Sequence, residues 1–220
     1  MIKVLYEDNH TIAVVKPPGV PVMPDSSGDA SMMDLVKTYL KEKYNKPGNV
    51  FLGLVQRLDR STGGAMVFAK TSKGASRLSE QIRERKISKT YLAVVSGVME
   101  NRSGEMKDFL LKDSKNNKSE VVREGTTGAK QAVLQYTVEG ESDGFSLVNI
   151  KLITGRHHQI RVQFSSRKHI LYGDIKYGSP SKAKLGLWAK ELEFYKPVGG
   201  DPVKVFCEPD YCAEPWRRFS

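Results

Sequence analysis

The chain has 220 residues, of which 39% are hydrophobic and 27% are charged, which fits one large or two small globular domains with a substantial core. Its longest apolar runs have about five residues, far short of the roughly 18 of a membrane-spanning helix, and its first residues are not a signal peptide. We therefore expect a cytoplasmic protein with no membrane contact, and its formal net charge of +10 favours a polyanionic partner.

The first quarter of the chain predicts a hairpin, a stiff loop and a helix. Short β-branched runs at 3–6 and 11–15 flank a segment of turn composition, which is typical of a β-hairpin. The stretch 16–22 is too rich in proline for a central strand. Ser31 stands three residues before an acid, and Met33, Val36, Leu40 and Tyr44 then repeat at helical spacing, so we expect a helix over about 32–45.

The sequence Gln-Arg-Leu-Asp-Arg-Ser-Thr-Gly-Gly spans residues 56–64 and precedes an apolar strand at 65–69. Its one acid, Asp59, stands between Arg57 and Arg60. Because opposite charges within a few ångströms lower the pKa of a carboxyl by roughly 1 to 3 units, Asp59 should be ionised at neutral pH. Such a group suits a nucleophile or an electrostatic stabiliser better than a general acid. Taken alone, the string favours a structural Asp that caps the turn at Ser61 and Thr62 and pairs with Arg60.

The rest of the chain predicts a mostly antiparallel sheet with two more helices. Thr71 or Ser72 caps a helix, a strong strand signal covers 89–95, and strand-like runs alternate with polar turns from about 105 to 155. A helix should run from Gly155 to about Lys168. Further strands are expected near 186–194 and 203–207. Since no repeat or linker appears, we predict one domain over residues 1–220.

The histidines and cysteines do not indicate a metal site. Cys207 and Cys212 are the two cysteines, and no second pair of ligands lies near them in the sequence. His157 and His158 are adjacent, so on a helix they should point in different directions, and no carboxylate or cysteine completes a ligand set. We therefore expect no bound metal.

Two segments concentrate the positive charge. From Lys151 to Lys190 there are nine basic residues and one acid, Asp174, and from Lys70 to Lys89 there are seven basic residues and two acids. Since neutralisation of phosphates supplies most of the non-specific affinity for nucleic acids, both segments indicate a surface for a polyanion. A generally basic protein is the alternative interpretation.

Several separated motifs together resemble the RluA-type pseudouridine synthases. They are Lys16-Pro17-Pro18-Gly19, the Arg-Leu-Asp-Arg-x-Thr-x-Gly core at 57–64, Lys89-x-Tyr91-Leu92-Ala93, Gly155-Arg156-x-His158-Gln159-Ile160-Arg161 and Gly173-Asp174-x-x-Tyr177-Gly178. The resemblance implies an α+β fold, the pseudouridine synthase fold, with a mixed, mostly antiparallel central sheet flanked by helices and loops. It also implies a monomeric enzyme that isomerises uridine in ribosomal or transfer RNA to pseudouridine without a metal or cofactor.

The resemblance assigns roles to individual residues. Asp59 is the essential carboxylate, Tyr91 stacks on the extruded uracil and takes part in proton transfer, and Arg161 pairs with Asp59. The other expected contacts fall into two groups, substrate binding by Arg57, Arg60, His158, Gln159 and Ile160, and RNA binding by Arg156, Lys176, Lys182 and Lys184. Arg57 should occupy the position vacated by a base that is flipped out of the RNA.

The chain departs from the family pattern at three positions. Gln56 replaces the usual His, Gly63 the usual Ser, and His157 a common Thr. These departures keep a second hypothesis open, a non-catalytic RNA-binding protein that retains the fold. A nucleoside or glycoside hydrolase is a third hypothesis, which we rank last because the motifs offer only Asp174 as a second carboxylate.

Overall fold

A computed structural model describes residues 2–220, and the chain divides into two compact units. Unit 1 contains residues 2–88 and 189–208, and unit 2 contains residues 89–188 and 209–220. The prediction of one domain over 1–220 stays a prediction. No helix within residues 2–220 is both long enough and apolar enough to cross a membrane.

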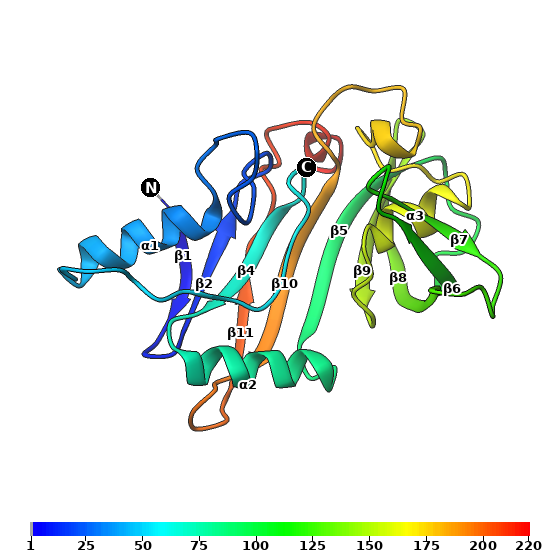
Figure 1. Ribbon diagram of the computed structural model, residues 1–220. Coiled ribbons are helices and arrows are strands. Elements are labelled where there is room, and N and C mark those ends of the chain that lie inside the picture. The colour runs from blue at the N-terminus through cyan, green and yellow to red at the C-terminus, as the bar shows by residue number, and fades with distance from the viewer. Residues whose placement is uncertain (1) are drawn as a thin grey trace. The chain divides into compact units, whose positions relative to one another are not determined.

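Unit 1 is a sheet with two helices (Figure 1). Its elements are β1 (Lys3–Glu7), β2 (Thr11–Lys16), α1 (Met32–Lys43), β3 (Gly53–Leu54), β4 (Gly63–Ala69), α2 (Ser72–Arg83), most of β10 (Leu187–Tyr195) and β11 (Pro202–Phe206). The strand order is β1-β2-β4-β10, with β11 beside β10 and β3 beside one end of β4. The expected hairpin is confirmed, since β1 and β2 pair antiparallel with Glu7 opposite Ile12.

Helix α1 begins and ends for local reasons. The Ser31 hydroxyl accepts the N–H of Asp34, and the Asp34 carboxylate accepts the N–H of Ser31, which is a capping box. Met32, Val36 and Leu40 are buried at helical spacing against the apolar residues of β2 and β4. The predicted helix is thus confirmed, but Tyr44, expected on its apolar stripe, is 46% exposed because the helix has already ended.

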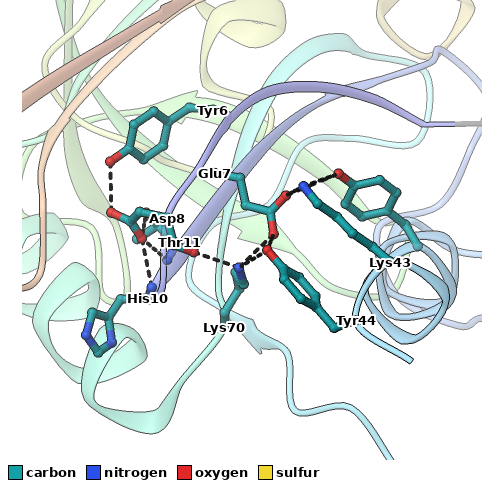
Figure 2. Close-up of polar contacts among 9 residues, drawn as sticks. Tyr6, Glu7, Asp8, His10, Thr11, Lys43, Tyr44 and Lys70 are labelled. Atoms are coloured by element: carbon teal, nitrogen blue, oxygen red, sulfur yellow. Dashed lines mark hydrogen bonds and ion pairs between the residues drawn. The ribbon is translucent and has the colours of Figure 1, made fainter. Parts of the chain in front are cut away.

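A carboxylate with four donors, the Tyr39 hydroxyl at 3.1 Å among them, joins α1 to the hairpin (Figure 2). Glu7 Oε2 accepts Lys43 Nζ at 2.8 Å, and Oε1 accepts Lys70 Nζ at 2.6 Å and the Tyr44 hydroxyl at 2.7 Å. Burial alone would raise the pKa of Glu7, but these hydrogen bonds outweigh it and lower the pKa to about 2. The network ties the end of α1 and the end of β4 to the β1–β2 hairpin.

The second helix is confirmed as well. Helix α2 starts after Thr71, whose hydroxyl accepts the N–H of Gly74 at 3.1 Å, as expected for an N-cap. Leu78 is fully buried, and α2 packs on β3 and β4.

Unit 2 is a second antiparallel region of sheet with one α-helix (Figure 1). Its elements are β5 (Ser88–Ser96), β6 (Ser103–Asp113), β7 (Lys118–Val122), β8 (Lys130–Ser142), β9 (Phe145–Leu152), α3 (Gln159–Ser165) and the 3-10 turns η1 (Ile175–Tyr177) and η2 (Trp216–Phe219). The strand order is β5-β9-β8-β6-β7, and each neighbouring pair is antiparallel. The predicted strands and the α+β class are therefore confirmed.

Helix α3 is shorter than the helix predicted from Gly155 to Lys168. It begins only at Gln159, because His158 has a left-handed backbone with φ of 51° and precedes it as the N-cap. Phe164 packs edge-on against Tyr136 of β8 with ring centroids 6.1 Å apart. The residues from Gly155 to His158 therefore form a structured turn that leads into the helix.

Candidate active site

The motif at 56–64 folds as a tight turn at the start of β4. The carbonyl oxygen of Asp59 accepts the N–H of Thr62 at 3.0 Å, which closes the turn. The Asp59 side chain is half-buried, while Arg57 and Arg60 on either side are exposed. An exposed Arg57 is in keeping with the expected contact to RNA.

Lys16 donates hydrogen bonds to the backbone of this turn. It is the last residue of β2, and its fully buried ammonium donates to the carbonyl oxygens of Thr62 at 2.7 Å, Arg60 at 2.8 Å and Pro17 at 3.1 Å. Burial lowers the pKa of Lys16 to about 8, although the negative charge of Asp59 acts in the opposite direction. The lysine of the Lys-Pro-Pro-Gly motif is thus a positive charge beside the Asp59 turn.

Arg60 makes ion pairs with two acids that the sequence did not suggest. Its guanidinium pairs with Asp29 and, at 3.3 Å, with Asp25, and its Nε donates to the carbonyl oxygen of Gly19 at 2.9 Å. The N–H of Gly19 in turn donates to the carbonyl oxygen of Arg60 at 2.8 Å. Arg60 therefore joins the proline-rich loop to the turn, and the charge of Asp59 acts on the ammonium of Lys16.

Gly64 is required where the turn enters β4. Its φ is +117°, and a Cβ atom placed there would lie 2.3 Å from the carbonyl oxygen of Ala189 in β10. Lys16 lies opposite Gly64 in the antiparallel pairing of β2 with β4. The close approach of β10 and the pairing with β2 together determine where the Asp59 turn ends and β4 begins.

In unit 2, Arg161 is aligned by a buried carboxylate. Its Nε and Nη2 each lie 2.7 Å from an oxygen of Asp174, and the two side chains are 8% and 1% exposed. The guanidinium also lies over the ring of Tyr177, with Cζ 5.2 Å from the centroid. The predicted partner of Arg161 was Asp59, and that pairing stays a prediction; the bidentate pair with Asp174 had not been foreseen.

Tyr177 connects this ion pair to the β6–β7 hairpin. Its hydroxyl accepts the N–H of Ser119 at 2.9 Å, donates to the Ser119 carbonyl oxygen at 3.2 Å, and lies 3.1 Å from Nδ1 of His158. The tyrosine of the Gly-Asp-x-x-Tyr-Gly motif thus supports both Arg161 and the turn before α3.

The two adjacent histidines do not diverge as expected. The rings of His157 and His158 stack with centroids 3.8 Å apart, because both residues precede the helix and His158 has a left-handed backbone. His157 Nδ1 lies 2.9 Å from the hydroxyl of Ser119. Within residues 2–220 there is no group of three or more His, Cys, Asp or Glu side chains able to hold a metal ion.

Gln159 organises the loop before the helix. Its Oε1 accepts the Thr154 hydroxyl at 2.8 Å and the N–H of Arg156 at 3.0 Å, and its Nε2 donates to the carbonyl oxygen of Val133 at 3.1 Å. Arg156 Nε donates to the carbonyl oxygen of Gln131 at 2.9 Å. Both residues therefore shape the loop, and their contacts to RNA stay predictions.

The remaining predicted residues of unit 2 are distributed between its core and its surface. Tyr91 in β5 is 8% exposed and Ile160 in α3 is 4% exposed. Lys176 is exposed and donates to the carbonyl oxygen of Asn117 at 3.0 Å, and Lys182 and Lys184 are exposed on the loop before β10. The exposed lysines are accessible to a polyanion, as the charge count had suggested.

A family model described as RNA pseudouridylate synthase matches residues 10–166. The ribosomal large subunit pseudouridine synthase C of Buchnera aphidicola (subsp. Baizongia pistaciae) is 34% identical over 94% of this chain and 67% of its own length. The ribosomal large subunit pseudouridine synthase D of Zymomonas mobilis is 32% identical over 94% of this chain and 69% of its own length. The chain thus spans about two thirds of the length of these two relatives.

Solved structures show the same fold. Human RNA pseudouridylate synthase domain containing 4 superposes with a TM-score of 0.79 at 24% identity, covering 95% of this chain and 89% of its own. Human RNA pseudouridylate synthase domain containing 1 gives a TM-score of 0.77 at 24% identity, covering 98% of this chain and 86% of its own. The predicted fold is therefore confirmed.

Proposed function

Because this chain belongs to the RNA pseudouridylate synthase family, we propose that it converts uridine to pseudouridine in the RNA of the large ribosomal subunit. The family makes it an RNA-modifying isomerase, and a non-catalytic RNA-binding role is not favoured. The ribosomal substrate is taken from the names of its relatives, two of which act on the large subunit. We also propose that it acts as a cytoplasmic monomer.

The reaction rearranges bonds within one nucleotide. The N-glycosidic bond between N1 of uracil and C1′ of ribose breaks, the base turns, and a bond forms between C1′ and C5. The proton lost from C5 is balanced by the proton gained at N1, so the reaction needs no oxidant, reductant or external group. Whether a carboxylate attacks C1′, adds to the ring or removes a sugar proton, it must be ionised and close to the nucleoside.

One observation supports Asp59 as this carboxylate. Its turn is held by the ammonium of Lys16, which binds two carbonyl oxygens of the turn and is itself fully buried. A turn fixed in this way presents Asp59 with little freedom to move, which is what a reagent for a single nucleoside requires.

The substrate must leave its helix before it can react. A uridine in paired RNA is unstacked at a cost of a few kcal/mol, and the enzyme compensates with contacts to the flipped nucleotide. We assign Arg57 to the vacated position in the RNA, Tyr91 to the face of the extruded uracil, and Arg161 to the orientation of Asp59. The alignment of Arg161 by Asp174 supports this last role, because it restricts the guanidinium to one orientation.

The test is Asp59→Asn, assayed on unmodified transcripts of large-subunit ribosomal RNA and of transfer RNA. Pseudouridine has the mass of uridine, so sites are mapped with a carbodiimide that modifies pseudouridine. We expect the wild-type protein to modify the ribosomal transcript and Asp59→Asn to bind it without modifying it. Asp201→Asn, at an exposed carboxylate of unit 1, is the control and should keep full activity.

Two results would contradict this proposal. Pseudouridine formation by Asp59→Asn at the wild-type rate would remove Asp59 from the chemistry. Modification of the transfer RNA alone would leave the isomerase activity intact but refute the ribosomal substrate.

A further inference from the structure

Lys89 is a half-buried lysine whose ammonium has no acceptor within residues 2–220. No hydrogen bond or ion pair involves it, and burial, with no opposing carboxylate, lowers its pKa. Other lysines withdrawn from water in this protein are compensated. Lys16 binds three carbonyl oxygens, and Lys70 binds Glu7 and the carbonyl oxygen of Asp8. An uncompensated ammonium is unfavourable in the free protein.

The position of Lys89 places this charge at the candidate site of unit 2. It lies two residues before Tyr91 in β5, so both side chains project from the same face of the sheet, with their Cα atoms about 7 Å apart. A Cβ atom added to Gly155 would lie 3.8 Å from Lys89 Nζ. Gly155 is exposed and opens the turn that contains His158 and Gln159. The ammonium therefore lies where the face that carries Tyr91 meets an exposed loop.

The chemistry of the missing partner follows from the charge. A uracil ring and a ribose are neutral and cannot offset a full positive charge, whereas a phosphodiester carries a negative charge on oxygens that accept N–H groups. A lysine ammonium is a compact point charge that suits a phosphate oxygen without demanding bidentate geometry. The distance from Lys89 to Tyr91 along the strand is comparable with the length of one nucleotide.

We propose that Lys89 binds a backbone phosphate of the RNA strand next to the uridine that Tyr91 contacts. The substrate then supplies the acceptor that the free protein lacks, and binding energy is gained where the nucleotide must be held after flipping. This inference rests on the proposed function, because it takes RNA as the substrate and Tyr91 as a residue of the site.

The test compares Lys89→Met and Lys89→Arg in the Asp59→Asn background, so that RNA binds without turnover. The probe is the unmodified large-subunit ribosomal RNA transcript, and affinity is measured over a series of salt concentrations. For Lys89→Met we expect affinity to fall about 5- to 10-fold and the slope of log affinity against log salt to decrease by about 0.7 to 0.9. Lys89→Arg keeps the charge and should keep the slope.

Thermal melting of the free protein separates binding from a structural role. Lys89→Met removes an uncompensated ammonium, so its melting temperature should rise by about 2–4 °C. Lys196→Met is the matched control, because Lys196 already has a carboxylate partner, Asp201, at 3.1 Å. We expect that control to leave the salt slope and the affinity unchanged.

An unchanged slope and affinity in Lys89→Met would overturn the inference, and so would a lower melting temperature accompanying weaker binding. Pseudouridine formation by the protein with Asp59 intact is measured on the same transcript. Activity without a slope change would refute the role of Lys89 alone. A slope change without activity would refute the proposed isomerisation while leaving the phosphate contact supported.

Discussion

The ammonium of Lys16 donates to the carbonyl oxygen of Thr62 at 2.7 Å, across 46 residues of sequence. This contact joins the end of β2 to the turn that carries Asp59. The same ammonium also binds the carbonyl oxygen of Arg60, so it fixes the backbone at two positions shortly after Asp59. Lys16 is therefore a positioning residue for Asp59.

Lys16→Met should slow pseudouridine formation at least about tenfold and lower the free energy of unfolding by about 3 kcal/mol. The thioether side chain fills the space but donates to none of the three carbonyl oxygens, so the buried hydrogen bond to Thr62 and the part-buried ones to Arg60 and Pro17 are lost. The measurements are turnover on the ribosomal transcript and urea denaturation. Lys3→Met, at an exposed lysine of β1, is the control. Wild-type turnover in Lys16→Met would show that the turn does not need this support.

Turnover of the wild-type protein should decline as the pH rises through about 8. The pKa of Lys16 is about 8 in the folded protein, whereas a lysine in an unfolded chain has a pKa of about 10.5. The ammonium of the folded protein therefore loses its charge and one donor as the pH rises through about 8. Between these pH values the unfolded chain binds more protons, so titration of Lys16 by itself raises the free energy of unfolding. A decline in turnover there cannot come from unfolding driven by this group. Turnover that stays constant up to pH 9.5 would contradict the prediction.

Asp174→Asn and Arg161→Met should each destabilise the protein by about 3–5 kcal/mol, because each leaves one member of a buried bidentate pair without its partner. The double variant should be less destabilised than the sum of the two, with a coupling energy of about 1–3 kcal/mol. Urea denaturation of the four proteins gives this cycle. The exposed pair of Lys86 with Glu84 is the control and should give a much smaller coupling energy. Strict additivity at Arg161 and Asp174 would show that the pair does not align Arg161.

The sequence predicts elements better than it predicts contacts. The hairpin, α1, α2 and β5 follow from turn composition, capping residues and apolar periodicity, which act over a few residues. The start of α3 was misplaced because His158 adopts a left-handed backbone that no local signal announces. Helical spacing likewise put Tyr44 on a buried stripe, although α1 ends one residue earlier.

At the candidate site too, the sequence predicted which residues take part but not which contacts they make. The motifs identified the residues of the Asp59 turn, but not that Arg60 pairs with Asp25 and Asp29 or that the charge of Asp59 acts on Lys16. These partners lie about 30 to 45 positions apart in the sequence, so only the fold brings them together. A signal for Lys16 was present, since a lysine that continues the buried run of β2 must find acceptors inside the protein.

Glu7→Gln should lower the free energy of unfolding at neutral pH by about 1.5–3 kcal/mol, because the Glu7 carboxylate accepts hydrogen bonds from two ammonium groups and two hydroxyls (Figure 2). The pKa of Glu7 is lowered to about 2 in the folded protein, so its contribution is present above pH 4.5 and is lost as the pH falls from 4.5 towards 2. The stability difference between the wild-type protein and Glu7→Gln should shrink over that range. Glu84→Gln, at an exposed pair, is the control. A difference that is constant with pH would contradict the assignment.

Gly64→Ala should destabilise the protein by about 2–4 kcal/mol and reduce turnover, because β10 leaves no room for a side chain at the start of β4. The new Cβ atom would lie 2.3 Å from the Ala189 carbonyl oxygen, and the φ of +117° is strained for any residue with a Cβ. Either β10 moves away or the turn that carries Asp59 shifts, and both changes disturb the contacts of Lys16 with that turn.

Gly48→Ala is the matched control, since no atom lies within 4 Å of its added Cβ and its backbone is not in the left-handed region. Its stability should change by no more than about 0.5 kcal/mol. Urea denaturation and turnover on the ribosomal transcript check both variants, and a Gly64→Ala protein as stable and active as Gly48→Ala would show that β10 does not constrain the turn.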